Sequence, residues 1–597
     1  MTPRARRSGA AGGSARRRGG TDRRRHRLQT RVRVALLLVG FVLSMFAARL
    51  VQLQGVDAAA YASMAQAEST RTVTLHAARG QILDRDGAEL ATSVDAVALA
   101  ADPTQTSDQA PEIAAVLTRV LGLDYFATVE ALRTPDTRFA YLARQVPQWR
   151  ADRALEQLSA ANLAGVYPER DPLRVYPADD VAANVIGFVG QDGVGLQGLE
   201  SVFDLFMRGR DGEATYTVSP SGEQIPLSPG AEQQPTPGLG LQLTIDRDVQ
   251  WYAQRRLRMA VEETGGESGT AITIDVDTGE VLALADYPSY DPNRPAATAR
   301  DDRGSRAVQN VYEPGSVEKV LTFGALLDAG LVEPDTRLRV PPSLTFDGHT
   351  VHDDWGHGPL RYTASGVLAH SSNLGTIRAA MRLPAGELEA YLRSFGLGEA
   401  TGVGLAGESD GLLAEHTTWP DIQHATIAFG QGLSVTAIQL AAAVNAVAND
   451  GVYVQPSLVQ GVVTDGELGD RVQPEAHRVI SVGAAERLQL MMETVTREQA
   501  TGVNGRIEGY RVAGKTGTSQ RVVDGEYAPG QRVISYAGFA PVEDPQFMTY
   551  VVIDFPKDGS YGGTAAAPVF RDVMSYVLRR YAVAPSSTRP PQIPLTW

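Results

Sequence analysis

An unbroken apolar run near the N-terminus is the clearest feature of the hydrophobic pattern. Residues 34–48 (VALLLVGFVLSMFAA) contain no charged side chain. With the five residues from Arg49 to Leu53 the run reaches about 20 residues, enough for a helix to cross a bilayer. Arg49 lies near the far end, where a long side chain can extend to the interface. The pattern predicts one transmembrane anchor, residues 34–54, and no later stretch is long and apolar enough for a second span.

From about residue 240 the pattern alternates between strand-like and helix-like segments. Apolar residues recur every second position in some segments and at helical spacing in others. Strands are predicted at 241–245, 271–275, 281–285, 511–520, 533–541 and 547–555, and helices at 246–264, capped by Asp246, and at 568–581. Strands open and close this region while mostly helical material fills its middle. The order predicts an α+β domain with one sheet assembled from both ends of the sequence.

The pattern also divides the chain into parts. Between the anchor and this domain, Asp86-Gly87 separates apolar runs as a tight-turn signal, helix-like patterns alternate with breakers over 110–165, and residues 219–239 resemble a linker or hairpin. We therefore predict these divisions: a basic disordered tail at 1–33, the anchor at 34–54, an N-terminal domain at 55–235, the α+β domain at 236–582, and a proline-rich tail at 583–597.

Charge is distributed unevenly and sets the expected topology. Residues 1–33 hold twelve arginines and one aspartate, so this segment carries +11 while the rest of the chain carries −25. A basic tail can bind nucleic acid, but beside an apolar span it predicts that the N-terminus stays in the cytoplasm. The alternative is a cleaved signal peptide, with Ala60-Tyr61-Ala62 as a distant small-residue site. Cysteine is absent, which excludes disulfides and thiol chemistry.

Lysine is almost absent, and its three positions are informative. Of the 55 basic residues, 52 are arginine, and the lysines are Lys319, Lys515 and Lys557. Arginine cannot lose its proton in a protein, whereas a desolvated lysine amine can act as a base. Lys319 and Lys515 lie in chemically meaningful contexts and are interpreted as positions that need an amine. Lys557, in a Pro-Lys-Asp-Gly segment, is interpreted as a surface turn residue.

Three short motifs carry the candidate chemistry. Ser316, after Pro314-Gly315, is predicted at a helix N-terminus with Lys319 one turn later on the same face. A serine hydroxyl becomes a nucleophile when an adjacent base takes its proton. The other two are Ser371-Ser372-Asn373, after the helical run 364–369, and Lys515-Thr516-Gly517-Thr518, in a strand-like run. Each motif alone is a weak signal, since a capped helix with a surface lysine also reads S-x-x-K.

Together and in this order the motifs resemble those of penicillin-binding proteins and class A β-lactamases. From the anchor to about residue 582 the chain resembles a class B penicillin-binding protein, a peptidoglycan D,D-transpeptidase. The Ser-Ser-Asn and Lys-Thr-Gly-Thr forms are similar to those of the division-specific, septal type, and the arginine bias is typical of a high-GC bacterium such as an actinobacterium. Further matching segments are Arg79-Gly80, Asp84-Arg85-Asp86-Gly87, Tyr176-Pro177, Gly195 to Glu200, Phe429 to Gly432, and Tyr561-Gly562-Gly563. Glu318 and Asp86 depart mildly from the usual pattern.

The resemblance implies a fold and a cellular setting. It implies a single transmembrane helix, an elongated non-catalytic pedestal, and a β-lactamase-like transpeptidase domain with an antiparallel sheet flanked by helices. It implies a cell-membrane protein with an extracytoplasmic catalytic domain, acting at the division septum on D-Ala-D-Ala stem peptides and acylated by β-lactams. The implied partners are a multi-span lipid II glycosyltransferase and other divisome membrane proteins. No cofactor, metal or nucleic acid is implied.

The resemblance also implies roles for the motif residues. Ser316 attacks the carbonyl between two D-alanines and Lys319 accepts its proton. Ser371 passes a proton to the departing D-alanine, and Asn373 holds the substrate amide and the Lys319 amine. The N–H groups of Ser316 and Thr518 form an oxyanion hole. The remaining residues bind the substrate's carboxylate region or admit a ligand close to the strand: Lys515, Thr516, Thr518 and Gly517.

Other functions and other residue roles stay open at this stage. A β-lactamase or D,D-carboxypeptidase would resolve the acyl-enzyme with water, an elongation-type transpeptidase would act elsewhere in the wall, and a β-lactam sensor or divisome scaffold would turn over little. The segment holding His349, His352, Asp353, Asp354 and His357 matches no standard zinc spacing and is interpreted as part of the active-site rim. Arg79, Asp84 and Arg85 are interpreted as a structural ion-pair network.

Overall fold

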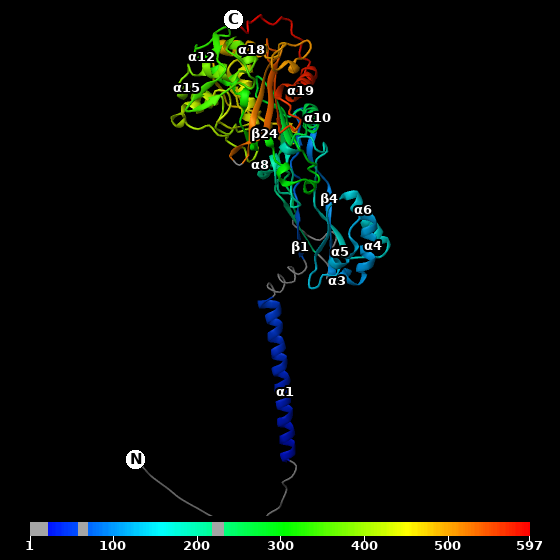
Figure 1. Cartoon of the computed structure of the whole chain (residues 1–597). Coiled ribbons are helices and arrows are strands. Elements are labelled where there is room, and N and C mark those ends of the chain that lie inside the picture. Colours follow the sequence, from blue (N-terminus) through cyan, green and yellow to red (C-terminus); the bar gives the residue numbers. More distant parts are fainter. Residues whose placement is uncertain (1–21, 58–69, 218–231, 524) are drawn as a thin grey trace, which may run out of the picture. The chain divides into compact units, whose positions relative to one another are not determined.

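The computed structural model describes residues 22–57, 70–217, 232–523 and 525–597. Its elements, some of which are labelled in Figure 1, belong to two compact units. One unit comprises residues 1–74 and 213–234, and the other comprises residues 75–212 and 235–597. The segment Ala60-Tyr61-Ala62 and most of the predicted 219–239 linker lie outside the described residues.

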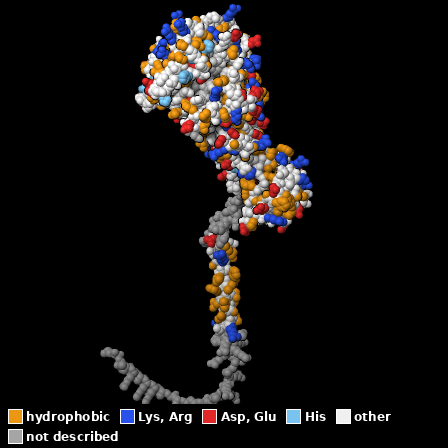
Figure 2. All heavy atoms as spheres, in the orientation of Figure 1, with side chains coloured by type: hydrophobic (Ala, Val, Ile, Leu, Met, Phe, Trp, Pro, Cys, Tyr) orange, Lys and Arg blue, Asp and Glu red, His pale blue; other side chains and the backbone are white. Residues whose placement is uncertain are grey.

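The first unit contains the apolar N-terminal helix. Helix α1 runs Asp22–Val51 and continues into a π-helical turn, Gln52–Val56. Within it, Thr30–Gly55 is long and apolar enough to cross a membrane, and Figure 2 shows its exposed hydrophobic side chains in orange. This agrees with the predicted anchor. The prediction of disorder over residues 1–33 is wrong from Asp22 onward, because arginine is a good helix former and extends a helix already nucleated by the apolar run.

The same unit holds a small sheet of strand order β1-β8-β9. Its strands are β1 (Thr70–Leu75), β8 (Gly212–Thr217) and β9 (Glu232–Gln233), and β8 pairs antiparallel with β9. Strand β8 precedes the predicted 219–239 region and β9 lies within it, so their antiparallel pairing supports the hairpin interpretation at the described residues.

The N-terminal part of the second unit is an α/β subdomain. Strand β4 (Ala96–Ala101) is buried along its whole length and lies between β5 (Ala140–Pro147) and β6 (Val166–Arg170). Helices α4 (Ala110–Leu121), α5 (Tyr125–Leu132) and α6 (Gln148–Ala160) share one hydrophobic core with it. The sequence pattern did not predict β4, because its alanines have low strand propensity and its burial comes from both neighbours.

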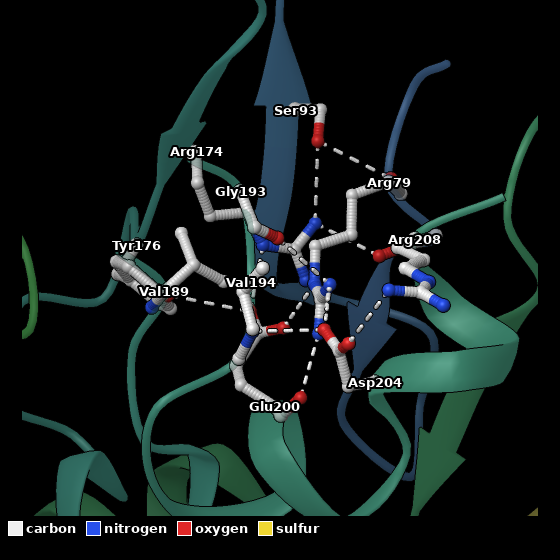
Figure 3. Close-up of polar contacts among 12 residues, drawn as sticks. Arg79, Ser93, Arg174, Tyr176, Val189, Gly193, Val194, Glu200, Asp204 and Arg208 are labelled. Atoms are coloured by element: carbon white, nitrogen blue, oxygen red, sulfur yellow. Dashed lines mark hydrogen bonds and ion pairs between the residues drawn. The ribbon is translucent and has the colours of Figure 1, made fainter. Parts of the chain in front are cut away.

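A buried ion network joins distant segments of the N-terminal part of the second unit (Figure 3). The Glu200 carboxylate is fully buried and accepts from Nε of Arg79 at 2.5 Å and from Nε of Arg174 at 2.7 Å. Arg79 also pairs with Asp204 at 2.7 Å. The network interpretation is confirmed for Arg79 but wrong for Asp84, whose carboxylate instead accepts backbone N–H groups in the turn that follows it.

A six-stranded sheet crosses the predicted boundary at residue 236. Its order is β21-β20-β10-β2-β3-β7, with Leu241 of β10 paired parallel to Ile82 of β2. The strands are β2 (Ile82–Leu83), β3 (Glu89–Val94), β7 (Leu173–Val175), β10 (Gly240–Leu243), β20 (Val459–Thr464) and β21 (Glu467–Leu468). Placing segment 241–245 in the sheet of the α+β domain was therefore wrong, because alternation predicts a strand but not its partner.

The main sheet of the α+β domain has five antiparallel strands in the order β12-β11-β25-β24-β23. Its first two strands come from the start of the domain and its last three from the end, as predicted. They are β11 (Ser268–Asp275), β12 (Val281–Tyr287), β23 (Ala513–Val523), β24 (Glu526–Ala540) and β25 (Phe547–Asp554).

Helices cover both faces of this sheet. On one face α10 (Arg247–Thr264) and α19 (Ala567–Arg580) share a core with strand residues. As predicted, Asp246 caps α10 by accepting N–H groups of Asp248 and Val249. The other face packs against α17 (Ala437–Ala448), α12 (Lys319–Asp328) and α18 (Val482–Thr494). The candidate motifs lie at the β23 edge, on the side of α12.

The proline-rich segment 583–597 is not a free tail. It forms no helix or strand, yet its backbone carbonyls accept hydrogen bonds from Tyr510, Arg497 and Thr363 of the α+β domain. Proline cannot donate from its backbone nitrogen, so such a segment binds mainly through its carbonyls and side chains.

Candidate active site

Ser316 lies in a single 3₁₀ turn, Gly315–Val317, immediately before α12. Gly315 has φ +54, and its N–H donates to the carbonyl of Gly430 at 3.0 Å. A Cβ on Gly315 would lie 2.9 Å from the carbonyl oxygen of Thr518, so the serine turn packs closely against β23. Glycine is needed here for both its φ and its lack of side chain. The predicted position of Ser316 at a helix N-terminus is confirmed.

Lys319 joins the first motif to the second. Its side chain is fully buried, and Nζ donates to Oδ1 of Asn373 at 2.7 Å and to the carbonyl oxygen of Ser371 at 2.6 Å. The hydroxyl of Ser371 lies 3.3 Å from the same nitrogen. Ser371 follows α13 (Ala364–Ala369) and has φ +58. A non-glycine residue in that region costs on the order of 1 kcal/mol and is held by its surroundings.

Lys515 completes the link to the third motif. It is fully buried in β23, and its Nζ donates to Oγ of Ser371 at 2.8 Å and to the carbonyl of Thr516 at 2.8 Å. The Ser371 hydroxyl thus lies between two lysine amines from different segments. Thr516 donates to Oγ1 of Thr501 at 3.1 Å. The structure therefore brings the three predicted motifs together at one point.

Burial controls the charge of the two lysines. Desolvation lowers the pKa of Lys319 from 10.5 to about 8, while Asp353, Asp354 and Glu318 oppose the shift. Burial, together with the positive charge of Lys319, lowers the pKa of Lys515 well below its usual value. Protonating both amines in one desolvated site is unfavourable, because burial and the like charge both disfavour the second ammonium group. The site is therefore supplied with a base near neutral pH.

The space beside Gly517 is occupied by protein atoms. A Cβ at this position would meet Oγ of Ser535 at 2.2 Å, Cγ2 of Val317 at 3.0 Å and the carbonyl oxygen of Pro314 at 3.3 Å. Protein atoms fill the space into which a Cβ on Gly517 would point. The expectation that this glycine admits a ligand to the strand is therefore wrong on that side. Its lack of a side chain instead lets the Ser316 turn pack onto β23.

The buried carboxylate of Asp353 stabilises the turn that carries the second motif, Ser371-Ser372-Asn373. The carboxylate accepts from Oγ of Ser372 at 2.7 Å, from the N–H of Leu374 at 3.0 Å, and lies 2.9 Å from Nε2 of His357. Ser372 in turn caps α14 (Asn373–Ala380) by accepting the N–H of Gly375. The rim interpretation of the His349–His357 segment is confirmed, but the support of the Ser-Ser-Asn turn by Asp353 was not predicted.

Glu318 is a buried carboxyl next to the proposed base. It has no exposed surface, Oε1 accepts from Oγ1 of Thr322 at 2.8 Å, and Oε2 has no partner within the described residues. Burial raises its pKa well above the usual value. The mild sequence departure at this position is thus a carboxyl packed beneath the motif, where burial disfavours its charged form. Nothing in the sequence pattern distinguished it from a surface glutamate.

An open cleft of about 390 Å³ lies in front of these groups. Its lining includes Ser316, Ser371, Thr516 and Thr518, together with residues that sequence reasoning did not single out. The additional lining residues are Trp355, His370, Thr501, Val503, Asn504 and Thr564. Asp354, from the segment interpreted as part of the active-site rim, also lines the cleft. Tyr561, Gly562 and Gly563, one of the segments that match the family, also line the cleft. Thr501 could have been found only by its packing, since no motif surrounds it.

Family models match most of the chain. The penicillin-binding protein transpeptidase domain matches residues 269–575, and the penicillin-binding protein dimerisation domain matches residues 74–243. The second match ends at the last residue of β10, the strand that pairs with β2 of the N-terminal part.

Individual relatives are similar over nearly their full lengths. The penicillin-binding protein PbpB of Mycolicibacterium smegmatis is 36% identical over 95% of this chain and 92% of its own length. The peptidoglycan D,D-transpeptidase FtsI of Escherichia coli is 35% identical over 87% of this chain and 86% of its own. The crystal structure of penicillin-binding protein 3 from Mycobacterium tuberculosis, complexed with aztreonam, is 31% identical, with a TM-score of 0.69 over 88% of this chain and all of that one. The chain therefore belongs to the class B penicillin-binding proteins, in which a dimerisation domain precedes a transpeptidase domain.

Proposed function

We propose that this protein is a membrane-anchored peptidoglycan D,D-transpeptidase that works through an acyl-enzyme on Ser316. The observation that carries the proposal is the hydroxyl of Ser371, held between the amines of Lys319 and Lys515 beside the Ser316 turn. Relatives whose names state this activity, and a relative crystallised with a β-lactam, support it.

The first half-reaction forms the acyl-enzyme. Neutral Lys319 takes the proton of Ser316, whose Oγ bonds to the carbonyl carbon between the two D-alanines. The N–H groups of Ser316 and Thr518 stabilise the negative oxygen of the tetrahedral intermediate. The C–N bond then breaks, and the proton returns through Lys319 and Ser371 to the leaving D-alanine amine. Asn373 keeps the Lys319 amine in place through the 2.7 Å hydrogen bond.

The second half-reaction forms the cross-link. An amine of a neighbouring stem peptide attacks the ester carbon, and Ser371 and Lys319 take its proton. The ester C–O bond breaks, and the proton passes to Oγ of Ser316, which restores the serine hydroxyl. In the preceding acylation step, Thr516 and Thr518, which line the cleft on β23, bind the donor's terminal carboxylate before that D-alanine leaves, with Lys515 buried beside them. A β-lactam opens on Ser316 in the first step and blocks the second.

Intact-mass measurement with benzylpenicillin tests the proposal directly. The full-length chain in detergent is expected to gain one penicillin mass, mapped to the peptide holding Ser316 and lost in Ser316→Ala. Ser560→Ala, which alters a serine in the turn before Tyr561, serves as the matched control and is expected to retain the adduct. No adduct on folded protein would overturn the transpeptidase proposal, whereas rapid penicillin turnover without accumulation would indicate a hydrolase.

We further propose the cellular setting that the family relationship suggests. The twelve arginines before the apolar helix support a cytoplasmic N-terminus and an extracytoplasmic catalytic domain. The Ser-Ser-Asn and Lys-Thr-Gly-Thr motifs support action at the septum, with a multi-span glycosyltransferase bound through the anchor and pedestal. The proposed division of the chain keeps the pedestal at 55–235 and the transpeptidase domain at 236–582. A fluorescent fusion that labels the lateral wall uniformly would contradict the septal assignment.

A further inference from the structure

Residues 583–597, here called the C-terminal strap, lie extended along the transpeptidase domain. Ile593, Leu595 and Trp597 are half-buried, while the residues between them are exposed. Burial at every second residue is the pattern of an extended chain laid against a surface. The strap is therefore held by side chains as well as by its carbonyls.

The end of the strap pairs with β17 (Leu360–Thr363), the strand that leads into α13. The N–H of Thr363 donates to the carbonyl of Leu595 at 3.1 Å, and its hydroxyl donates to the carbonyl of Pro594 at 2.7 Å. The indole N–H of Trp597 donates to the carbonyl of Tyr362 at 3.1 Å. Three guanidinium groups lie over the Trp597 ring, those of Arg337, Arg339 and Arg361, at 5.2, 6.0 and 5.4 Å from its centroid.

This contact reaches the helix that carries Ser371. Thr363 caps α13 by accepting the N–H of Gly366 at 3.0 Å with the same hydroxyl that binds the strap. A Cβ on Gly366 would lie 1.9 Å from the carbonyl oxygen of Leu595, so the strap lies directly against the first turn of α13. That helix has only six residues, and Ser371 follows it after one residue.

The middle of the strap binds Arg497, which precedes a turn that contacts the site. The two Nη atoms of Arg497 donate to the carbonyls of Ile593 and Pro591 at 2.9 and 2.6 Å. The turn after Arg497 leads to Thr501, whose N–H donates to the carbonyl of Ala369 at the end of α13, 3.3 Å away. Thr501 also accepts the hydroxyl of Thr516.

The start of the strap contacts the segment that enters β23. The hydroxyl of Tyr510 donates to the carbonyl of Val583 at 2.7 Å, and the N–H of Arg511 donates to Oγ of Ser586 at 2.8 Å. Strand β23 begins two residues later and carries Lys515. The strap therefore contacts both the start of α13, which leads to the second motif, and the segment that enters β23, which carries the third motif.

We propose that the C-terminal strap positions Ser371 and Thr516 for acylation of Ser316, which makes its residues positioning residues of the transpeptidase site. The inference rests on the proposed function. The two motifs lie on separate segments, and the strap is bonded to the segments from which both are built. Proton transfer through Ser371 depends on hydrogen-bond distances, and a displacement of about 1 Å can cost about 100-fold in rate.

Acylation kinetics of the full-length chain in detergent test this. A variant that ends at residue 586 is expected to acylate with nitrocefin about 10- to 100-fold more slowly in the first-order step. The binding constant that precedes this step is expected to stay within about threefold, because the cleft-lining side chains remain. Trp597→Ala is expected to show a smaller loss of the same kind. The matched control is Trp149→Ala, which removes a tryptophan 67% exposed in the pedestal, and wild-type rates are expected for it.

Two further measurements separate positioning from loss of fold. Thr363→Val removes the shared hydroxyl and is expected to slow the first-order step, whereas Thr363→Ser restores it. Amide hydrogen exchange over residues 364–376 needs no activity and is expected to quicken in the shortened chain but not in Trp149→Ala. Unchanged exchange, or wild-type acylation by the shortened chain, would overturn the strap proposal. Absence of any adduct on wild-type protein would instead overturn the proposed function, leaving exchange to decide the strap.

Discussion

Replacing Lys319 by arginine separates its role as a base from its role as a charge. Arginine keeps the positive charge and can donate to Asn373, but it does not lose its proton in a protein. Lys319 is fully buried, and its amine donates to Asn373 at 2.7 Å. Lys319→Met, which has similar volume and no base, shows whether any loss comes from overpacking by the larger guanidinium. Lys515→Arg is the matched change at the other buried lysine.

The expected magnitude follows from the pKa of Lys319. Burial lowers it from 10.5 to about 8, a shift that corresponds to about 3 kcal/mol. At pH 7.4 roughly one fifth of these amines are neutral, compared with roughly 0.1% for an amine in water, a gain of about 250-fold in free base. An arginine at this position stays protonated and so supplies no neutral base. We expect Lys319→Arg and Lys319→Met to acylate about 10³-fold more slowly than wild type, within the range for loss of a general base.

The pH profile gives the sign of the effect. Because the neutral amine is the reactive form, the wild-type acylation rate is expected to rise with pH and to level off above about pH 8. Lys319→Arg should show no such rise. Lys515→Arg should keep the inflection and move it to lower pH, because a permanent cation near Lys319 disfavours its protonated form.

Stopped-flow acylation with a fluorescent penicillin between pH 6 and pH 10 measures these rates, with thermal unfolding as the check on folding. A folded Lys319→Arg or Lys319→Met variant that acylates within threefold of wild type would refute the assignment of Lys319 as the base. So would a wild-type profile that is flat between pH 6 and pH 9.

Three further changes have definite expected outcomes. Glu318→Gln should raise the melting temperature most at pH 8 and least near pH 4.5. Because burial raises the folded pKa of Glu318, its stability contribution is complete below the unfolded value of 4.5 and declines as the pH rises. An equal gain at both pH values would contradict this. Glu200→Gln leaves Arg79 and Arg174 without their shared buried carboxylate and should lower the free energy of unfolding by about 3–5 kcal/mol in urea titrations, while protein that remains folded acylates normally. Gly517→Ala should lower the free energy of unfolding by about 1–3 kcal/mol and slow acylation, because the added Cβ would overlap the neighbouring strand and the Ser316 turn. An unchanged melting temperature and acylation rate would contradict this by showing that the site has space for the methyl group.

The sequence determined the parts of this protein that depend on local pattern. An apolar run of helix length predicts an anchor, a period of two or 3.6 predicts a strand or a helix, and Asp246 marks the start of α10. The three motifs were visible because each is a short run with fixed spacing. The scarcity of lysine added weight to Lys319 and Lys515, since an arginine cannot serve as a base.

Only the tertiary structure decided which distant segments meet. Alternation predicted the strand at β10 but not its pairing with Ile82, because period two defines faces and leaves the neighbour open. The lowered pKa of Lys319 required Ser371 and Asn373, more than 50 residues away, to cover its amine. From the sequence, Glu318 was only a mild departure from the family pattern, and residues 583–597 were predicted only as a proline-rich tail. Burial and hydrogen bonding are properties of the packed chain, so no local pattern could assign them.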